Sequence, residues 1–117
     1  MLTNTTINLA YLDLMSDGDD DLKKMMLEML FDEPSTEIAE MRTLAAAADW
    51  KALKAVSHKL KSTFSYVGND DLTATNQRIE KAAIEEKNLD EVPTLIERVA
   101  TIWDGVLPKL KETAAAL

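Results

Sequence analysis

The stretch "DWKALKAVSHKLKSTFSYVG", from Asp49 to Gly68, decides the fold of this chain. Its apolar residues recur at intervals of three and four, which is typical of one face of an α-helix; they are Leu53, Val56, Leu60, Phe64 and Val67. Asp49 is a good N-cap residue, and Gly68 suits the left-handed position that ends many helices. The sequence therefore predicts a helix from Trp50 to about Val67, with one face buried in a core.

His58 is the single histidine of the chain, and it lies on the opposite side of this helix. On a helical wheel it is roughly 160° from the centre of the apolar face, so it points to water. The side chains that share or flank its face are polar, namely Lys51, Lys54, Lys61, Ser62 and Ser65. Although the whole chain has a formal net charge of −8, lysines are concentrated around the imidazole.

The composition predicts one soluble cytoplasmic domain covering residues 1–117. Hydrophobic residues make up 46% of the chain, which favours a folded protein. The absence of cysteine excludes disulfides and zinc–thiolate sites. No apolar run approaches the ~20 residues that a membrane helix needs, and the N-terminus does not resemble a signal peptide. The negative charge argues against general nucleic-acid binding.

Helix formers predominate, while glycine and proline number three each, so we expect an all-helical fold. The first three expected helices cover residues 7–15, 20–48 and 50–67. The fourth begins at residue 70 and ends within residues 85–90, and the last runs from residue 93 to about 110. Pro34 interrupts the second of these, which we interpret as one long helix bent at that point. Gly105 and Pro108 are expected to weaken or bend the last helix. Short connections then predict an antiparallel up-down four-helix bundle, with the short N-terminal helix laid over it.

A stripe of apolar residues with helical spacing precedes Pro34: Leu22, Met25, Met26, Met29 and Leu30. We interpret this stripe as core filling, because the spacing makes a single face. The alternative is an adaptable partner surface, for which methionine is well suited.

An exposed imidazole among lysines suggests a nucleophile for phosphoryl groups. A histidine ring is largely neutral at neutral pH, and nearby ammonium groups favour the neutral form and can hold phosphoryl oxygens. Ser62 is small, which leaves room for another protein's active site to reach the ring. An ordinary solvated helix face is the alternative. A metal site would have only weak carboxylate partners, and no serine or oxyanion hole marks a hydrolase.

The stretch around His58 resembles the histidine-containing phosphotransfer (HPt) domain of multistep phosphorelays. The family pattern is a histidine, then leucine-lysine-glycine, with a glycine ten residues after the histidine; here His58, Leu60, Lys61 and Gly68 match. Further matches are Leu72, Ile79, Glu80 and the acidic, apolar "DLKKMMLEMLFDE". Two positions depart from the pattern. Ser62 replaces a glycine, and Asn76 replaces a small or apolar residue on an inner helix face, where it needs a buried partner or a shifted helix.

The resemblance implies a phosphorelay intermediate rather than an enzyme with independent turnover. His58 would accept a phosphoryl group from a receiver-domain phosphoaspartate and pass it to an aspartate on another receiver. The implied partners are receiver domains of response regulators or hybrid histidine kinases, bound by a monomer without nucleic acid or membrane. The chain would need no cofactor or metal of its own, because Mg²⁺ belongs to the receiver. The alternative is a helical adaptor, or a domain that docks receivers without phosphotransfer.

The remaining site residues are expected to assist His58. Lys61, and more weakly Lys54, would stabilise the phosphoryl oxygens. Glu80 should lie at the height of His58 on an antiparallel helix and accept a hydrogen bond from Nδ1–H, leaving Nε2 as the nucleophile. The docking and access surface is assigned to Ser62, Ser65, Lys59 and Gly68, with the helix at residues 7–15 supplying part of it.

Overall fold

The structure is a computed structural model that describes residues 3–117. These residues form six α-helices and one short 3-10 helix, without a β-strand. In chain order the elements are α1 (Ala10–Ser16), α2 (Asp20–Met29), α3 (Glu33–Ala46), α4 (Trp50–Val67), α5 (Asp70–Glu85), η1 (Leu89–Glu91) and α6 (Val92–Ala115). The expected all-helical fold is confirmed.

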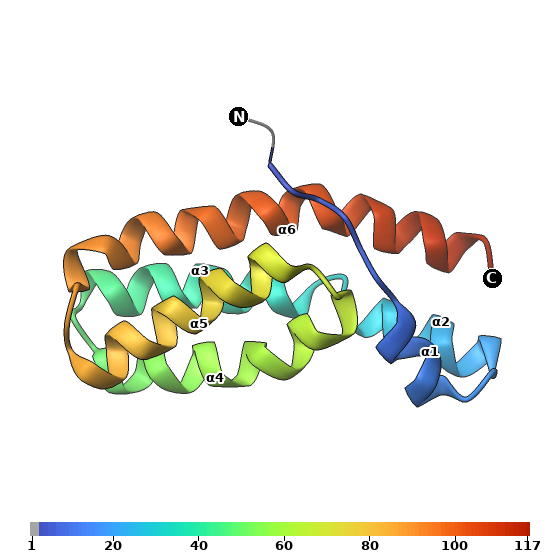
Figure 1. Cartoon of the computed structure of the whole chain (residues 1–117), viewed down its shortest axis with the longest axis horizontal. Coiled ribbons are helices and arrows are strands. Elements are labelled where there is room, and N and C mark those ends of the chain that lie inside the picture. Colours follow the sequence, from blue (N-terminus) through green and yellow to red (C-terminus); the bar gives the residue numbers. More distant parts are fainter. Residues whose placement is uncertain (1–2) are drawn as a thin grey trace.

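The four long helices α3, α4, α5 and α6 lie side by side along the longest dimension of the molecule (Figure 1). α3 packs against α4 and α6, and α5 packs against the same two helices. The core between them contains Phe64 and Trp103, whose ring centroids are 6.0 Å apart. α2 continues beyond the ends of α3, α4 and α5, where it contacts α1 and the C-terminal part of α6 (Figure 1). None of the helices in residues 3–117 is both long and apolar enough to cross a membrane.

Helix α4 has the bounds and the ends that the sequence predicts. The Asp49 carboxylate accepts a hydrogen bond from the Ala52 amide at 3.2 Å. Gly68 has a φ of 69°, and its amide donates to the Phe64 carbonyl. A Cβ on Gly68 would lie 2.1 Å from the Asn8 carbonyl oxygen, so both the backbone angle and the close approach require glycine. Of the five predicted core residues, all but Val56 are fully buried.

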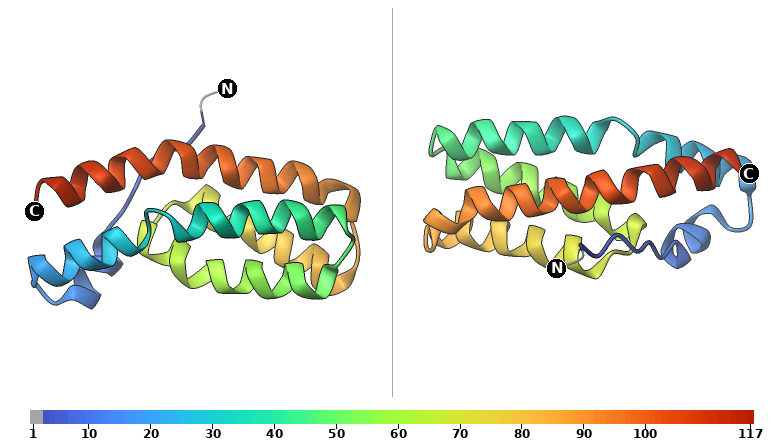
Figure 2. Two further views of the ribbon diagram at one scale, coloured as in Figure 1. Left: turned by 180° about the vertical axis from the view of Figure 1, so that it is seen from behind. Right: turned by 90° about the horizontal axis from the view of Figure 1, so that it is seen from above.

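The single helix expected over residues 20–48 is wrong. α2 ends at Met29 and α3 begins at Glu33, and Figure 2 shows two separate helices at this point. Pro34 explains the break, because an unbroken helix would lose one backbone hydrogen bond and its ring would clash with the preceding turn. In the first turn of a new helix the missing N–H costs nothing.

The interpretation of the α2 stripe as core filling is also wrong in part. Of the stripe, Leu30 is buried and Met26 is half-buried, but Leu22, Met25 and Met29 are 38%, 60% and 64% exposed, and the fully buried residue of α2 is Leu27, outside the stripe. The separation of α2 from α3 is the physical reason, since α2 lies beyond the ends of α3, α4 and α5 and packs mainly against α6 and α1, which leaves the rest of its surface in water (Figure 1).

The N-terminal helix begins at Ala10 rather than Ile7. The preceding residues cross the turn between α4 and α5 (Figure 1). The Asn8 amide donates to the Val67 carbonyl at 2.9 Å, and the Asn69 side chain donates to the carbonyls of Asn4 and Thr6. In a helix beginning at Ile7 the Thr6 carbonyl would accept from the Ala10 amide, but here that carbonyl accepts from Asn69 and the Ala10 amide donates to Oδ1 of Asn8.

α5 follows the expected pattern, whereas α6 does not end near residue 110 but continues to Ala115. α5 is capped by Asn69, whose side chain accepts from the Leu72 amide at 2.9 Å. α6 starts next to Pro93 and runs without interruption through Gly105 and Pro108. The α4 and α5 pair carries the residues discussed below.

Candidate functional site

His58 lies on the outward face of α4. Its side chain is 72% exposed, whereas Leu60 on the opposite face is fully buried. The apolar face of α4 is held by the core, so the ring has a fixed direction away from it. The wheel prediction that His58 points to water is confirmed.

The ring contacts a single charged side chain of the neighbouring helix. Nδ1 of His58 is 3.0 Å from Oε2 of Glu80 on α5, and the Glu80 side chain is only 20% exposed. An ionised carboxylate can only accept a hydrogen bond, so the contact requires the proton on Nδ1. Within residues 3–117 no hydrogen bond to Nε2 is present. In the neutral ring the lone pair is then on the second nitrogen, Nε2, which has no partner in the described residues.

A buried polar pair lies beneath this contact. The Ser57 hydroxyl is 2.8 Å from Oδ1 of Asn76, and Nδ2 of Asn76 donates to the Ser57 carbonyl at 2.9 Å. Asn76, the residue that departs from the family pattern, was expected to need a buried partner or a shifted helix, and Ser57 is that buried partner. Ser57 was not among the predicted site residues. Its signal in the sequence is its place on the buried face of α4, four residues after Leu53 and three before Leu60, where a polar side chain needs a partner.

Lys59 does not point to the ring but to α3. Its Nζ lies 2.8 Å from Oε1 of Glu37 and 3.0 Å from Oε1 of Glu33. Hydrogen-bonding contacts with these two carboxylates, and then their charges, raise the pKa of Lys59. Lys59 in turn lowers the pKa of Glu33 by the same two effects. This lysine is engaged in joining α4 to α3, although it was expected at the docking surface.

The other predicted residues on this face are exposed: Lys54, Lys61, Ser62 and Ser65. Within residues 3–117 neither Lys54 nor Lys61 forms an ion pair. The Ser65 hydroxyl donates to the Lys61 carbonyl at 2.9 Å and so is satisfied within α4. Ser62 follows His58 by one helical turn and carries only a small side chain above the helix surface. Gly68 lies ten residues beyond His58, at the end of α4.

An apolar hollow flanks this face on the side of α2 and α3. Its volume is about 170 Å³, and it is lined by Met26, Met29, Leu30, Glu33, Pro34, Thr63 and Tyr66. Tyr66 follows His58 by two turns and stacks on Tyr11 of α1, with ring centroids 5.3 Å apart. An apolar surface therefore extends from the His58 face of α4 to α2 and α1.

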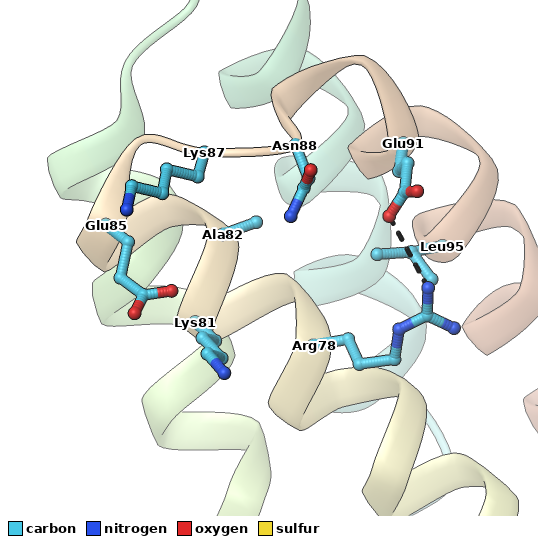
Figure 3. Close-up of a pocket in the computed structure, with 8 residues that line it drawn as sticks. All are labelled: Arg78, Lys81, Ala82, Glu85, Lys87, Asn88, Glu91 and Leu95. Atoms are coloured by element: carbon cyan, nitrogen blue, oxygen red, sulfur yellow. Dashed lines mark hydrogen bonds and ion pairs between the residues drawn. The ribbon is translucent and has the colours of Figure 1, made fainter.

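A second hollow, of about 200 Å³, lies between α5 and the start of α6 (Figure 3). Its charged residues are Arg78, Lys81, Glu85, Lys87 and Glu91, and Arg78 contacts Glu91 at 3.4 Å. The lining contains no histidine, serine or threonine. Among the residues that the structure describes, no group of three or more potential metal ligands is found here or elsewhere.

The family model for the Hpt domain matches residues 25–116 of this chain. The match covers most of the sequence and includes α3 to α6, the His58 face and Glu80. The chain therefore belongs to the Hpt domain family. No curated protein and no solved structure matches it significantly.

Proposed function

We propose that this protein is a phosphorelay intermediate whose phosphoacceptor is Nε2 of His58. The nitrogen attacks the phosphorus of a phosphoaspartate on a receiver domain. The Nε2–P bond forms as the bond from phosphorus to the aspartate oxygen breaks, and the aspartate leaves as a carboxylate. A second receiver aspartate then takes the phosphoryl group by the reverse step. Family membership supports this role in general, since Hpt domains act in phosphorelays.

The observation that carries the proposal is the state of the His58 ring. One nitrogen is engaged by Glu80 at 3.0 Å, and the other faces water on a side chain that is 72% exposed. A nucleophilic imidazole needs one nitrogen held and the other free, because the hydrogen bond at the first nitrogen fixes the lone pair on the second. A carboxylate at Nδ1 also stabilises the positive charge that the ring gains on attack.

Lys61 is proposed to contact the phosphoryl oxygens, with Lys54 as a weaker candidate. Both side chains leave α4 on the face of His58, three residues after it and four before it, where helical neighbours meet. Their ammonium groups have no carboxylate partner within residues 3–117. Charge-assisted hydrogen bonds to phosphate oxygens are about twice as strong as neutral ones.

The docking surface is proposed to be the polar face with Ser62 and Ser65 together with the apolar hollow beside it. A receiver must bring its own active site over the ring, so the surface around His58 has to be convex and the side chains next to the ring have to be small. The hollow at Tyr66 offers an apolar contact about two turns from the ring. We assign Mg²⁺ and the turnover chemistry to the receiver, and propose that the helices α3 to α6 form the up-down bundle that presents this surface.

Transfer of radiolabel from a phosphorylated receiver tests this function. The expected product is an acid-labile, alkali-stable label on this chain that maps to residue 58. A helical adaptor that only docks receivers would bind the receiver without acquiring label. That alternative is favoured by the exposed apolar side chains of Leu14, Met25 and Met29.

A further inference from the structure

The buried Ser57–Asn76 pair has a geometry that stability alone does not require. The two residues are 0% and 3% exposed; the Ser57 hydroxyl donates to Asn76, and the Asn76 side-chain amide donates to the main-chain carbonyl of Ser57. The Ser57 hydroxyl lies 2.8 Å from Asn76 Oδ1 and 3.1 Å from the Asn76 carbonyl oxygen, while Asn76 Nδ2 donates to the Ser57 carbonyl at 2.9 Å. This reciprocal arrangement joins α4 to α5 through directional contacts.

The pair lies next to the two residues that form the site. Ser57 directly precedes His58 on α4, and Asn76 precedes Glu80 by one turn on α5. In an α-helix the carbonyl of residue i accepts from the amide of residue i+4. The Asn76 carbonyl that receives the Ser57 hydroxyl is thus also the helical partner of the Glu80 amide. A displacement at the pair would move Glu80 directly.

We infer that Ser57 and Asn76 are positioning residues that set the register of α4 against α5 and so hold Glu80 at Nδ1 of His58. Only the expected effect of these residues on phosphoryl transfer rests on the proposed function; their effect on the His58 ring does not. Apolar packing is non-directional and tolerates small slides of one helix along another, whereas the 3.0 Å hydrogen bond between His58 and the largely buried Glu80 side chain does not. A single buried polar contact is known to specify register between packed helices.

The small net contribution of such a pair to folding stability supports a role in helix register. Replacing both partners of a buried hydrogen bond by apolar groups of similar shape is close to neutral for stability. An apolar pair at these two positions would therefore fold as well. What the polar pair adds is one permitted alignment of the two helices.

The experiment compares Ser57→Ala/Asn76→Leu with the wild type and with Thr75→Val. Thr75 is buried next to Asn76 on the same helix and serves as the matched control. The single variant Ser57→Ala is included because it leaves the buried side-chain Oδ1 of Asn76 without its donor and should lower the melting temperature more than the double variant does. The readout is the ¹⁵N NMR spectrum of the His58 ring above its titration range, which reports the ratio of the Nδ1–H to the Nε2–H tautomer.

The wild type and Thr75→Val should have mainly the Nδ1–H tautomer. In the folded double variant the tautomer ratio should fall by about fivefold, which corresponds to one ordinary hydrogen bond. Phosphoryl acceptance should fall with it. An unchanged ratio in the double variant, or a wild type without preference for Nδ1–H, would overturn the inference. The ring spectrum is independent of transfer, so a protein that keeps the tautomer effect but never accepts phosphate would contradict only the proposed function.

Discussion

Glu80 and Arg78 are two residues apart on α5, yet they belong to surfaces of opposite character. Glu80 faces α4 and contacts a ring that protrudes into solvent. Arg78 faces the start of α6 and lines a hollow with five charged side chains (Figure 3). The more enclosed of the two regions lacks an imidazole or hydroxyl nucleophile, while the exposed region contains the single histidine.

The two surfaces differ in the kind of binding partner that each can accommodate. A hollow is suited to a small molecule that leaves water behind. A phosphoryl group held in the active site of another protein cannot enter a hollow of about 200 Å³. It can be reached only by a nucleophile that projects from a convex surface. The exposure of His58 is thus a requirement of the proposed chemistry.

The largest expected effect comes from His58→Gln, set against Arg78→Gln in the hollow. The first change removes the nucleophile and should abolish phosphoryl acceptance, while the second should leave it unchanged. Because the ring is exposed, the free energy of unfolding of His58→Gln should stay within ~0.5 kcal/mol of the wild type. Transfer assays with a phosphorylated receiver and chemical denaturation measure the two quantities. Label on His58→Gln at the wild-type rate would show that the phosphoacceptor lies elsewhere.

Lys61→Ala should have the next largest effect. Loss of one charged hydrogen bond to the phosphoryl group costs ~1.5–3 kcal/mol, which corresponds to a transfer rate about ten to a hundred times lower. Lys87→Ala removes an exposed lysine from the other surface and is the matched control. Stopped-flow or quenched transfer kinetics provide the measurement. If both variants transfer equally fast, Lys61 has no contact with the reacting group.

A smaller effect is expected where α2 borders the His58 face. Met29→Ser removes an exposed apolar side chain from the hollow beside Tyr66, so receiver affinity should fall by a few-fold with little change in stability. Leu27→Ala, on the buried side of the same helix, should instead lower the free energy of unfolding by ~2–5 kcal/mol. Calorimetry of receiver binding and thermal unfolding separate the two. Wild-type affinity in Met29→Ser would exclude the hollow from the docking surface.

The sequence predicted the geometry of the site wherever one helix determines it. The apolar period of α4 fixes which face is buried, and His58 follows from it by rotation alone. The height of Glu80 followed from one turn at Gly68, because His58 lies ten residues before that glycine and Glu80 lies twelve residues after it. These inferences needed only helix geometry and a single antiparallel connection.

What the sequence could not reveal depends on contacts between distant residues. Ser57 occupies a core position of α4, but the sequence of α4 does not show which residue satisfies it, because its partner Asn76 is on another helix. Lys59 was expected to face a receiver, because nothing local indicates that Glu33 and Glu37 of α3 lie within its reach. Pro34 permits either a bent helix or a new one, and the choice depends on what α2 packs against.

The smallest effect concerns Lys59, which adjoins His58 but is bound to α3. Its contacts lower the pKa of Glu33, so the ion pair stabilises the folded state above the ordinary pKa of a glutamate and this contribution is lost as the pH falls through the lowered value. In Lys59→Met the pKa of Glu33 should rise towards its ordinary value, which carboxyl NMR titration measures.

The control for this change is Glu97 on α6, whose pKa is lowered chiefly by hydrogen bonds from Arg42 and should be the same in both proteins. Transfer from a receiver should slow much less in Lys59→Met than in Lys61→Ala, because the Lys59 ammonium is held at Glu37 and Glu33 and not at the ring. If the two variants slow transfer equally, Lys59 must leave its carboxylates when the receiver docks. The ion pair on α3 would then be a resting arrangement that the partner breaks.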